Sequence, residues 1–310
     1  MELRHLRCFL AVAQELHFAR AAEKLHIEQS PLSRAIKELE EELGIRLFDR
    51  NTRSTRLSRA GQVFMEHVPR VFSALNQARD SVRTVSAGYQ GRLRIALSGS
   101  ISQTHLTALL SRCREEEPDT EIRLYEVPLV QQIKGLESDL YDAGFSQSQE
   151  VGETLLAVPA WRDPMVVAVP SRHPLLIHKK LPLEEVLRYP LVLCDPDACE
   201  GCSRQVARVL NATDLEPIVA EQVASHDLMV TLVAAGYGLG FSTEAHVSTS
   251  HHPEIVTRPL AGRSPVLTTY LIRRIGEPSD TLQRFVERAL VDAPGRASDE
   301  ALDTSPGSSK

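Results

Sequence analysis

Long uninterrupted apolar runs are missing from this chain, and their absence excludes two classes of protein. The 310 residues contain no stretch of about 18 consecutive apolar residues, so no membrane-spanning helix is predicted. Charged residues interrupt the N-terminal segment MELRHLRCFLAVAQEL, which is not typical of a secretory signal peptide. We therefore expect a cytoplasmic protein that does not contact a membrane.

Cysteine is also scarce. The chain has five cysteines, at positions 8, 113, 194, 199 and 202. This number is small and odd, which excludes a disulfide framework and is typical of a reducing compartment.

Catalytic signatures are absent as well. The chain has no G-x-S-x-G, phosphate-loop or zinc-protease motif. GYGLG, at residues 236–240, follows a predicted helix instead of a strand, so it does not match a dinucleotide-binding turn. We predict a protein that is not an enzyme and needs no cofactor or metal.

Charge is distributed unevenly along the chain. Residues 1–90 contain 14 Lys and Arg against 11 Asp and Glu, whereas the whole chain has a formal charge of -6. The first ninety residues are therefore net positive and the remainder strongly negative. The N-terminal part is the better candidate to meet a polyanion such as DNA.

Three helices are predicted before residue 45. Apolar residues recur at three- and four-residue spacing between Leu3 and Leu16, and a second short helix is predicted over FARAAEKLHI. In the third, Ser30 is expected to be the N-cap and Pro31 the first helical residue. A short helix, a tight turn and a second helix are typical of a helix-turn-helix.

The third predicted helix changes charge along its length. Its first turns are neutral to basic, and Glu38, Glu40, Glu41 and Glu42 come later. The early turns of a recognition helix enter the major groove, where they reach phosphates and base edges. The candidate DNA contacts on this helix are Gln29, Ser30, Pro31, Ser33, Arg34 and Lys37. Taken alone, Arg34 and Lys37 could equally be ordinary solvated charges on an amphipathic helix.

A basic hairpin is predicted next. LFDRNTRSTRLS reads as two short strands around a polar turn, with Arg50, Arg53 and Arg56 at a spacing of three. Such a wing can lie along the phosphate backbone. We count these three arginines among the DNA-binding candidates.

A long helix is predicted from the N-cap Ser58 to about residue 87. Val68, Val71, Leu75 and Val82 belong to an apolar stripe of alternating three- and four-residue spacing, as in a coiled coil. Such a stripe can pack within its own domain or against an identical partner. We interpret it as a dimerisation helix.

The N-terminal segments together resemble the winged helix-turn-helix of LysR-type transcriptional regulators. The resemblance is carried by residues 1–50 and by TRLSRAG at residues 55–61. It implies a homodimer or homotetramer that binds a double-stranded DNA operator and responds to a small-molecule effector. Within the family, the regulators of benzoate, muconate and chlorocatechol pathways look nearest.

The rest of the chain alternates predicted strands and helices. After a strand that starts near residue 91, strands are predicted at 121–127, 141–146, 165–170, 190–195, 218–223 and 267–274, and helices at 104–118, 130–139, 203–212 and 225–236. This order favours an α/β fold with mainly parallel sheets.

The resemblance divides the chain further. It implies an α+β protein with a winged helix-turn-helix over 1–58, a dimerisation helix over 59–90 and an effector domain over 91–292, shaped like periplasmic binding proteins. Lobe 1 would take about 91–161 and 267–292, and lobe 2 about 162–266. Small, polar and charged residues after 292 predict a disordered tail over 293–310.

Ligands of such domains bind between the lobes, beyond the carboxyl ends of strands. The loop SGSIS follows a strand and precedes a helix, which suits an anion, although small-loop serines often only cap helices. With the resemblance, the candidate effector residues are Ser98, Gly99, Ser100, Ile101, Ser102, Phe145, Trp161, Cys199, Cys202, Ser225 and His226. We expect an organic or aromatic carboxylate.

Cys199 and Cys202 have C-x-x-C spacing, with Cys194 nearby. Such a pair can bind a metal or form a redox couple, but without a second pair it can also be two reduced thiols on a polar loop. A metal- or redox-responsive regulator is therefore the alternative function.

Overall fold

The computed structural model describes residues 1–51, 54–86, 89, 91–99, 101–249, 252–262 and 265–291. Arg53, Ser100 and the tail over 293–310 lie outside the described residues, as does the side chain of Arg50. The chain forms two compact units, Met1–Asp80 and Ser81–Lys310. Within the described ranges, no helix has the length and apolar character that a bilayer crossing requires.

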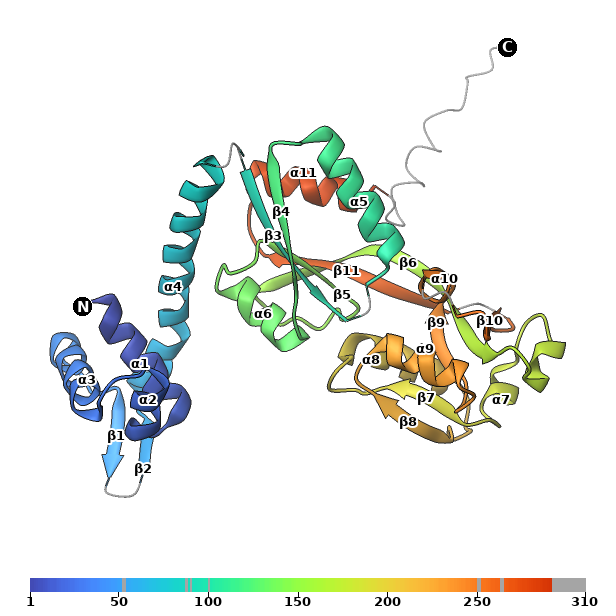
Figure 1. Cartoon of the computed structure of the whole chain (residues 1–310), viewed down its shortest axis with the longest axis horizontal. Coiled ribbons are helices and arrows are strands. Elements are labelled where there is room, and N and C mark those ends of the chain that lie inside the picture. Colours follow the sequence, from blue (N-terminus) through green and yellow to red (C-terminus); the bar gives the residue numbers. More distant parts are fainter. Residues whose placement is uncertain are drawn as a thin grey trace, which may run out of the picture. The chain divides into compact units, whose positions relative to one another are not determined.

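The first unit is helical with one hairpin (Figure 1). Its elements are α1 (Leu3–Glu15), α2 (Phe18–Lys24), α3 (Gln29–Leu43), β1 (Phe48–Asn51), β2 (Ser54–Leu57) and α4 (Arg59–Ser86), the last of which continues past the unit's boundary. Phe9, Ile36 and Phe48 are fully buried in its core. The predicted helices and hairpin are confirmed.

The second unit begins with β3 (Gly91–Ser98), which follows α4 along the chain. The next elements are α5 (Gln103–Glu116), β4 (Thr120–Glu126), α6 (Leu129–Glu137), β5 (Ala143–Ser146) and β6 (Leu155–Pro170). They are followed by the 3-10 helix η1 (Pro174–Ile177), α7 (Leu183–Val186), β7 (Leu191–Cys194), α8 (Glu200–Leu210), β8 (Val219–Val223) and α9 (His226–Ala234). The last are β9 (Gly240–Thr243), α10 (Glu244–Thr249), β10 (Ile255–Pro259), β11 (Val266–Arg274) and α11 (Asp280–Ala289).

The expectation of mainly parallel sheets is wrong. The large sheet has the order β10-β6-β11-β5-β3-β4, with β9 also paired to β6, and a second sheet pairs β7 with β8. β3 runs parallel to β4 and β5, and β7 runs parallel to β8. The long strands β6 and β11 pair antiparallel with each other and with their other neighbours in the sheet. The fold is therefore a mixed α/β arrangement.

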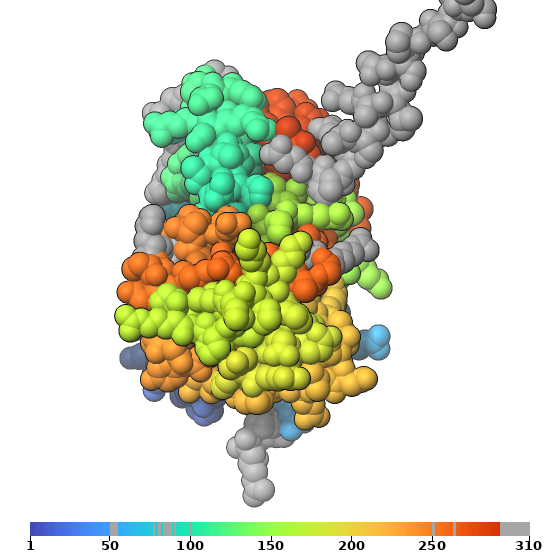
Figure 2. Space-filling model, turned by 90° about the vertical axis from the view of Figure 1, so that its right-hand side faces the viewer, coloured from blue at the N-terminus to red at the C-terminus, as the bar shows by residue number. Residues whose placement is uncertain are grey.

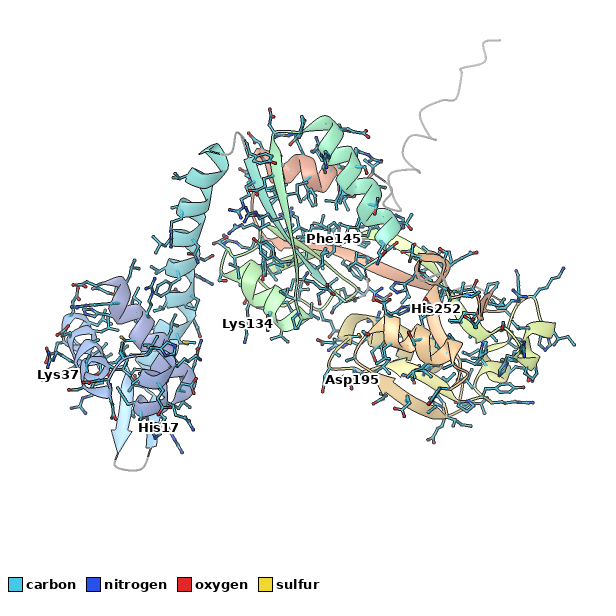
Figure 3. All side chains as sticks on the ribbon, in the orientation of Figure 1. His17, Lys37, Lys134, Phe145, Asp195 and His252 are labelled. Atoms are coloured by element: carbon cyan, nitrogen blue, oxygen red, sulfur yellow. The ribbon has the colours of Figure 1, made fainter. Side chains whose placement is uncertain are left out.

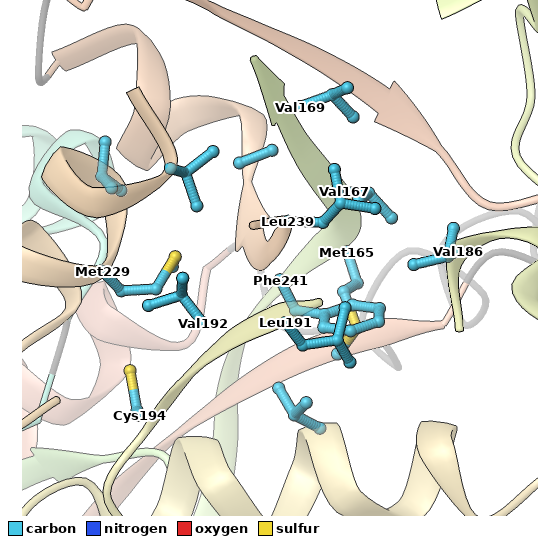
Figure 4. Close-up of a cluster of buried hydrophobic side chains, with 14 of the residues drawn as sticks. Met165, Val167, Val169, Val186, Leu191, Val192, Cys194, Met229, Leu239 and Phe241 are labelled. Atoms are coloured by element: carbon cyan, nitrogen blue, oxygen red, sulfur yellow. The ribbon is translucent and has the colours of Figure 1, made fainter. Parts of the chain in front are cut away.

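Buried side chains gather in separate cores around the two halves of the long strand β6. Two clusters of buried side chains, the larger of which contains Ile95, Phe145 and Phe285, form the core of what we call the first lobe. Figure 4 shows the other core, which contains Met165 and Leu239 and defines the second lobe. In Figure 2 the teal surface of α5 belongs to the first lobe, and the yellow and orange surface below it to the second.

Candidate DNA-binding surface and ligand cleft

α3 is held by one apolar face and leaves the other open. Leu32, Ile36 and Leu39 are fully buried against the core of the first unit. Gln29, Ser30, Pro31, Arg34 and Lys37 are exposed, and Ser33 is half-buried. Figure 3 shows Lys37 on the outer side of this helix. The DNA-binding candidates of α3 thus lie on its solvent side, apart from the partly covered Ser33.

The predicted start of α3 was wrong by two residues. Glu28 is the N-cap, Gln29 is the first helical residue, and no side-chain cap bond is made. Pro31 therefore sits in the first turn rather than at its start. It is tolerated there because the first N–H groups of a helix have no intrahelical acceptor.

The acidic end of α3 fastens the helix to its neighbours. The Glu40 Oε1 atom accepts hydrogen bonds from the backbone N–H groups of Leu47 and Phe48, at 2.8 and 3.1 Å. Glu38 lies 3.2 Å from the Nε2 atom of the buried His5. These carboxylates therefore fix α1 and the entry into the hairpin.

The hairpin has the register of a regular two-stranded wing. Phe48 pairs with Leu57 and anchors the base, and Asp49 pairs with Arg56. Arg56 is exposed. Of the three wing arginines, it is the one whose side chain the structure describes.

α4 packs on the first unit through its N-terminal half. Val68 is only 1% exposed and lies in the core of that unit, so its assignment to a dimer seam was wrong. An apolar helix face can bury against its own domain or a partner, and here its own domain covers Val68. Leu75 is half-buried, while Val71 and Val82 are exposed. These three remain candidates for a dimer contact.

In the second unit, the ends of β3 and β5 meet the loop before α8. A small cavity of about 10 Å³ lies between them. Its walls are Ser98, Gly99, Leu129, Ser146 and Gln147 from the first lobe, and Asp197, Ala198, Cys199, Glu200, Gly201 and Cys202 from the second. Four predicted effector residues, Ser98, Gly99, Cys199 and Cys202, are thereby brought together.

This cleft is closed. A cavity of about 10 Å³ holds no more than about one water molecule. The backbones also touch, since a Cβ atom on Gly201 would lie 2.5 Å from the carbonyl carbon of Gln147. A ligand larger than water can enter only if the lobes separate.

The Gln205 side chain fastens the closed form. Its Nε2 atom donates to the carbonyls of Gln147 and Thr268 at 2.6 and 2.8 Å, and its Oε1 atom accepts from the Thr268 N–H at 2.8 Å. Sequence reasoning missed Gln147, Gly201 and Gln205. Only a fold that brings β5 and α8 together reveals them.

Ile101 and Ser102 are buried beside the start of α5. Ile101 packs into the first-lobe core. The Ser102 hydroxyl has no hydrogen-bond partner, and Ser102 is the N-cap of α5 without a side-chain cap bond. A buried hydroxyl at a helix N-terminus suits an anion.

Phe145 and Trp161 do not line the cleft. Both side chains lie in the first-lobe core, where their rings stack with centroids 4.5 Å apart; Figure 3 labels Phe145. Alternate residues of a strand point to opposite faces, so Ser146 lines the cavity while its neighbour Phe145 faces the core. Their assignment to direct effector contact is corrected accordingly.

The cysteines do not match a reactive pair. Cys194, Cys199 and Cys202 are all buried. The neighbouring Cys194 thiol and burial raise the pKa of the Cys199 thiol well above its ordinary value. A thiolate that reacts with oxidants or binds soft metals needs a lowered pKa and some exposure. The burial of the three cysteines favours the interpretation that they are reduced thiols with a structural role.

Ser225 and His226 stand at the start of α9 and do not line the small cavity. Ser225 is exposed and caps the helix by accepting a hydrogen bond from the Leu228 N–H at 3.3 Å. His226 is buried, and its Nδ1 atom has no hydrogen-bond partner. Neither residue lies among the walls of the Ser98 and Cys199 cavity.

Two family models match the chain. The bacterial regulatory helix-turn-helix protein, lysR family, matches residues 3–62. The LysR substrate binding domain matches residues 86–291. The matches follow the division into a helical unit and a mixed sheet unit.

Similar proteins span most of the chain. The regulator BenM of Acinetobacter baylyi is 32% identical over 241 residues, covering 77% of this chain and 79% of its own. The regulator CatR of Pseudomonas putida is 31% identical over 284 residues, covering 92% and 96%. The crystal structure of full-length CbnR complexed with its target DNA has a TM-score of 0.69 at 25% identity, covering 93% of this chain and 99% of that one.

Proposed function

This chain belongs to the LysR family of transcriptional regulators, and we propose that it is a cytoplasmic, homo-oligomeric regulator whose DNA binding responds to a small organic carboxylate. Members of this family are regulators and not enzymes. The observation that carries the DNA-binding role is the exposed first half of α3, held on a buried apolar face within a matching helix-turn-helix.

The groove contacts are proposed for α3 and the wing. Gln29, Ser30, Ser33, Arg34 and Lys37 offer donors at the N-terminal end of α3, which is the end that enters the major groove in a helix-turn-helix. Pro31 lies in the same turn and offers apolar contact. Arg50, Arg53 and Arg56 supply the positive charge of the wing toward phosphates.

Arg34→Ala should weaken binding to a duplex selected by the unaltered protein by about 1–3 kcal/mol if Arg34 reads a base. Binding to a scrambled duplex should fall less. Fluorescence anisotropy with both duplexes measures the difference. Lys134→Ala, which removes an exposed cation from α6, is the matched control and should leave both affinities unchanged. Equal affinities of Arg34→Ala and the unaltered protein for the selected duplex would contradict this docking.

A dimer is proposed through the exposed part of α4. Val71 and Val82 are exposed and Leu75 is half-buried, an arrangement that an identical helix can cover. A dimer would also present two copies of α3 to one duplex. Sedimentation of the full chain tests this assembly, and a monomer at micromolar concentration would contradict it.

The carboxylate is proposed to bind where the lobes meet. Ser98, Gly99 and Ser146 line the first-lobe wall, and the buried Ser102 hydroxyl lies at the start of α5. Glu200, on the opposite wall, is already paired with Arg204, which reduces its repulsion of an anion. The resemblance to regulators of benzoate, muconate and chlorocatechol pathways guides the choice of acids to test.

A carboxylate that binds this cleft should raise the melting temperature of the full chain. At about 100 times its dissociation constant, it should stabilise the folded protein by about 2.7 kcal/mol. Ser98→Ala should weaken binding by about 1.5–3 kcal/mol, because one hydrogen bond to the charge is lost. A thermal-shift series of aromatic and aliphatic acids, with their amides, provides the measurement.

Ser171→Ala, in an exposed turn, is the control and should keep the response. If amides stabilise the protein as well as the acids do, the anion is not what the cleft recognises.

A further inference from the structure

Three potential metal ligands lie together where α9 begins and α10 passes. They are His226 and Asp227 on α9 and His246 on α10, and one ligand atom from each lies within 4.8 Å of the others. The His246 Nε2 atom is 3.0 Å from the Asp227 Oδ1 atom. The two imidazole rings are 3.9 Å apart between centroids and nearly perpendicular, at 70°.

His226 is set up as a neutral ligand. It is only 4% exposed, and burial disfavours the charged imidazolium. The Phe241 carbonyl accepts a hydrogen bond from the ring, whereas Nδ1 has no partner. The bond to the carbonyl therefore falls to the Nε2–H group, which leaves a lone pair on Nδ1. A metal-ligating histidine typically donates its other N–H in this way.

An ion pair between Asp227 and His246 does not explain why the buried His226 lies beside them. The pair between Asp227 and His246 would be complete without His226. A buried nitrogen without a hydrogen bond costs free energy unless something binds it. A cation bound to Nδ1 would remove that cost, and the Asp227 carboxylate would offset the unfavourable helix dipole at the start of α9.

The spacing fits a transition metal. Around a tetrahedral ion with bonds of about 2.0–2.1 Å, ligand atoms lie about 3.3–3.4 Å apart. The Asp227 and His246 atoms lie 3.0 Å apart and all three ligand atoms lie within 4.8 Å of one another, so side-chain movements of no more than about 1.5 Å would bring them to this value. Two imidazole nitrogens and one carboxylate oxygen suit Zn²⁺ and its neighbours better than Mg²⁺ or Ca²⁺, which prefer oxygen.

We propose that His226, Asp227 and His246 bind a divalent transition metal ion of the Zn²⁺ class, with water as the remaining ligand. The ion would connect the start of α9 to α10. Since α10 also packs against α5 and β6, the site lies next to first-lobe elements. The proposal goes beyond the carboxylate response and does not depend on it.

The test uses the full chain without a histidine tag. Isothermal titration with Zn²⁺ should give one strong site per chain, and Co²⁺ should develop the visible absorption of a tetrahedral complex. Asp227→Asn should weaken Zn²⁺ binding at least about tenfold. The Asp227 side chain is 80% exposed, so this change should not disturb folding.

His246→Ala should weaken Zn²⁺ binding by a similar factor or more. His252→Ala is the matched control, because His252 lies near α10 beside Val247 and Ser248 but outside the cluster (Figure 3). It should bind Zn²⁺ as the unaltered protein does. Absence of a strong site in the unaltered protein would overturn the proposal, and so would Asp227→Asn or His246→Ala binding Zn²⁺ as tightly as the unaltered protein does. DNA binding plays no part in this measurement, so failure of the proposed regulatory function would not mimic either result.

Discussion

Gly61→Ala is expected to unfold the DNA-binding unit while leaving the effector domain folded. A Cβ atom at position 61 would lie 2.0 Å from the carbonyl oxygen of Leu47 and 3.0 Å from its carbon. Backbone atoms cannot move aside as a flexible side chain can. We expect the free energy of unfolding of this unit to fall by about 3 kcal/mol or more. Overpacking destabilises a core, and it does so most where the clashing atoms belong to the backbone and cannot move.

The surrounding hydrogen bonds explain why the backbone cannot yield. The Ser58 N–H donates to the Leu47 carbonyl at 2.9 Å, and the Ser58 hydroxyl donates to the Arg46 carbonyl at 2.7 Å. The same hydroxyl accepts from the Gly61 N–H at 3.0 Å. The start of α4 is thereby fixed against the segment that leads into the wing.

The single tryptophan makes the measurement selective. Trp161 lies in the second unit, so its fluorescence does not report on the first. Gly61→Ala should lose helical circular dichroism and DNA binding while the Trp161 emission stays the same. Gln62→Ala, an exposed change on the same helix, should alter stability by no more than about 0.5 kcal/mol. Normal DNA binding by Gly61→Ala would contradict the close packing.

Local patterns were enough to predict the first unit. The apolar spacing before residue 45 and the cap at Ser58 are both local signals, and the elements follow them. The sequence pattern could not decide where the α4 stripe packs. The same apolar spacing is expected whether a helix packs on its own domain or on a partner. Val68 shows the difference, since the core of its own unit covers it.

Long-range pairing limited the prediction of the second unit. The first half of β6 was not predicted. It includes Pro159 and Pro164, and proline in a sequence usually argues against a strand. Its register with β11 joins segments about a hundred residues apart, such as Thr269 and Trp161. No local pattern encodes that contact or the direction of the strands.

The candidate sites follow the same rule. Ser98 and Cys199 were predicted because each stands in a recognisable local segment. The sequence predicted neither the closing contact of Gln205 nor the proposed metal site at His226, since their partners come from distant elements. His226 and His246 are twenty positions apart, a spacing that matches no known ligand motif.

Trp161→Ala is expected to destabilise the effector domain by about 3–5 kcal/mol, the cost of removing a large buried aromatic side chain. Its side chain is 3% exposed and lies between Phe145, at 4.5 Å, and His105, at 5.3 Å between ring centroids. The His105 Nε2 atom in turn lies 3.1 Å from Asp163, so the stack joins α5 to β6. Removing the indole leaves a cavity and frees both neighbours.

The test separates packing from ligand contact. Thermal unfolding followed by circular dichroism should show the loss without any ligand, and Trp161→Phe should recover most of the stability because an aromatic ring still fills the stack. Tyr237→Ala removes an aromatic ring that is 57% exposed and should have little effect. A Trp161→Ala protein with unchanged stability but no carboxylate response would place the indole in the ligand site and not in the core. That outcome would require the first lobe to open and expose Trp161, because in the closed structure its neighbours already cover both faces of the ring.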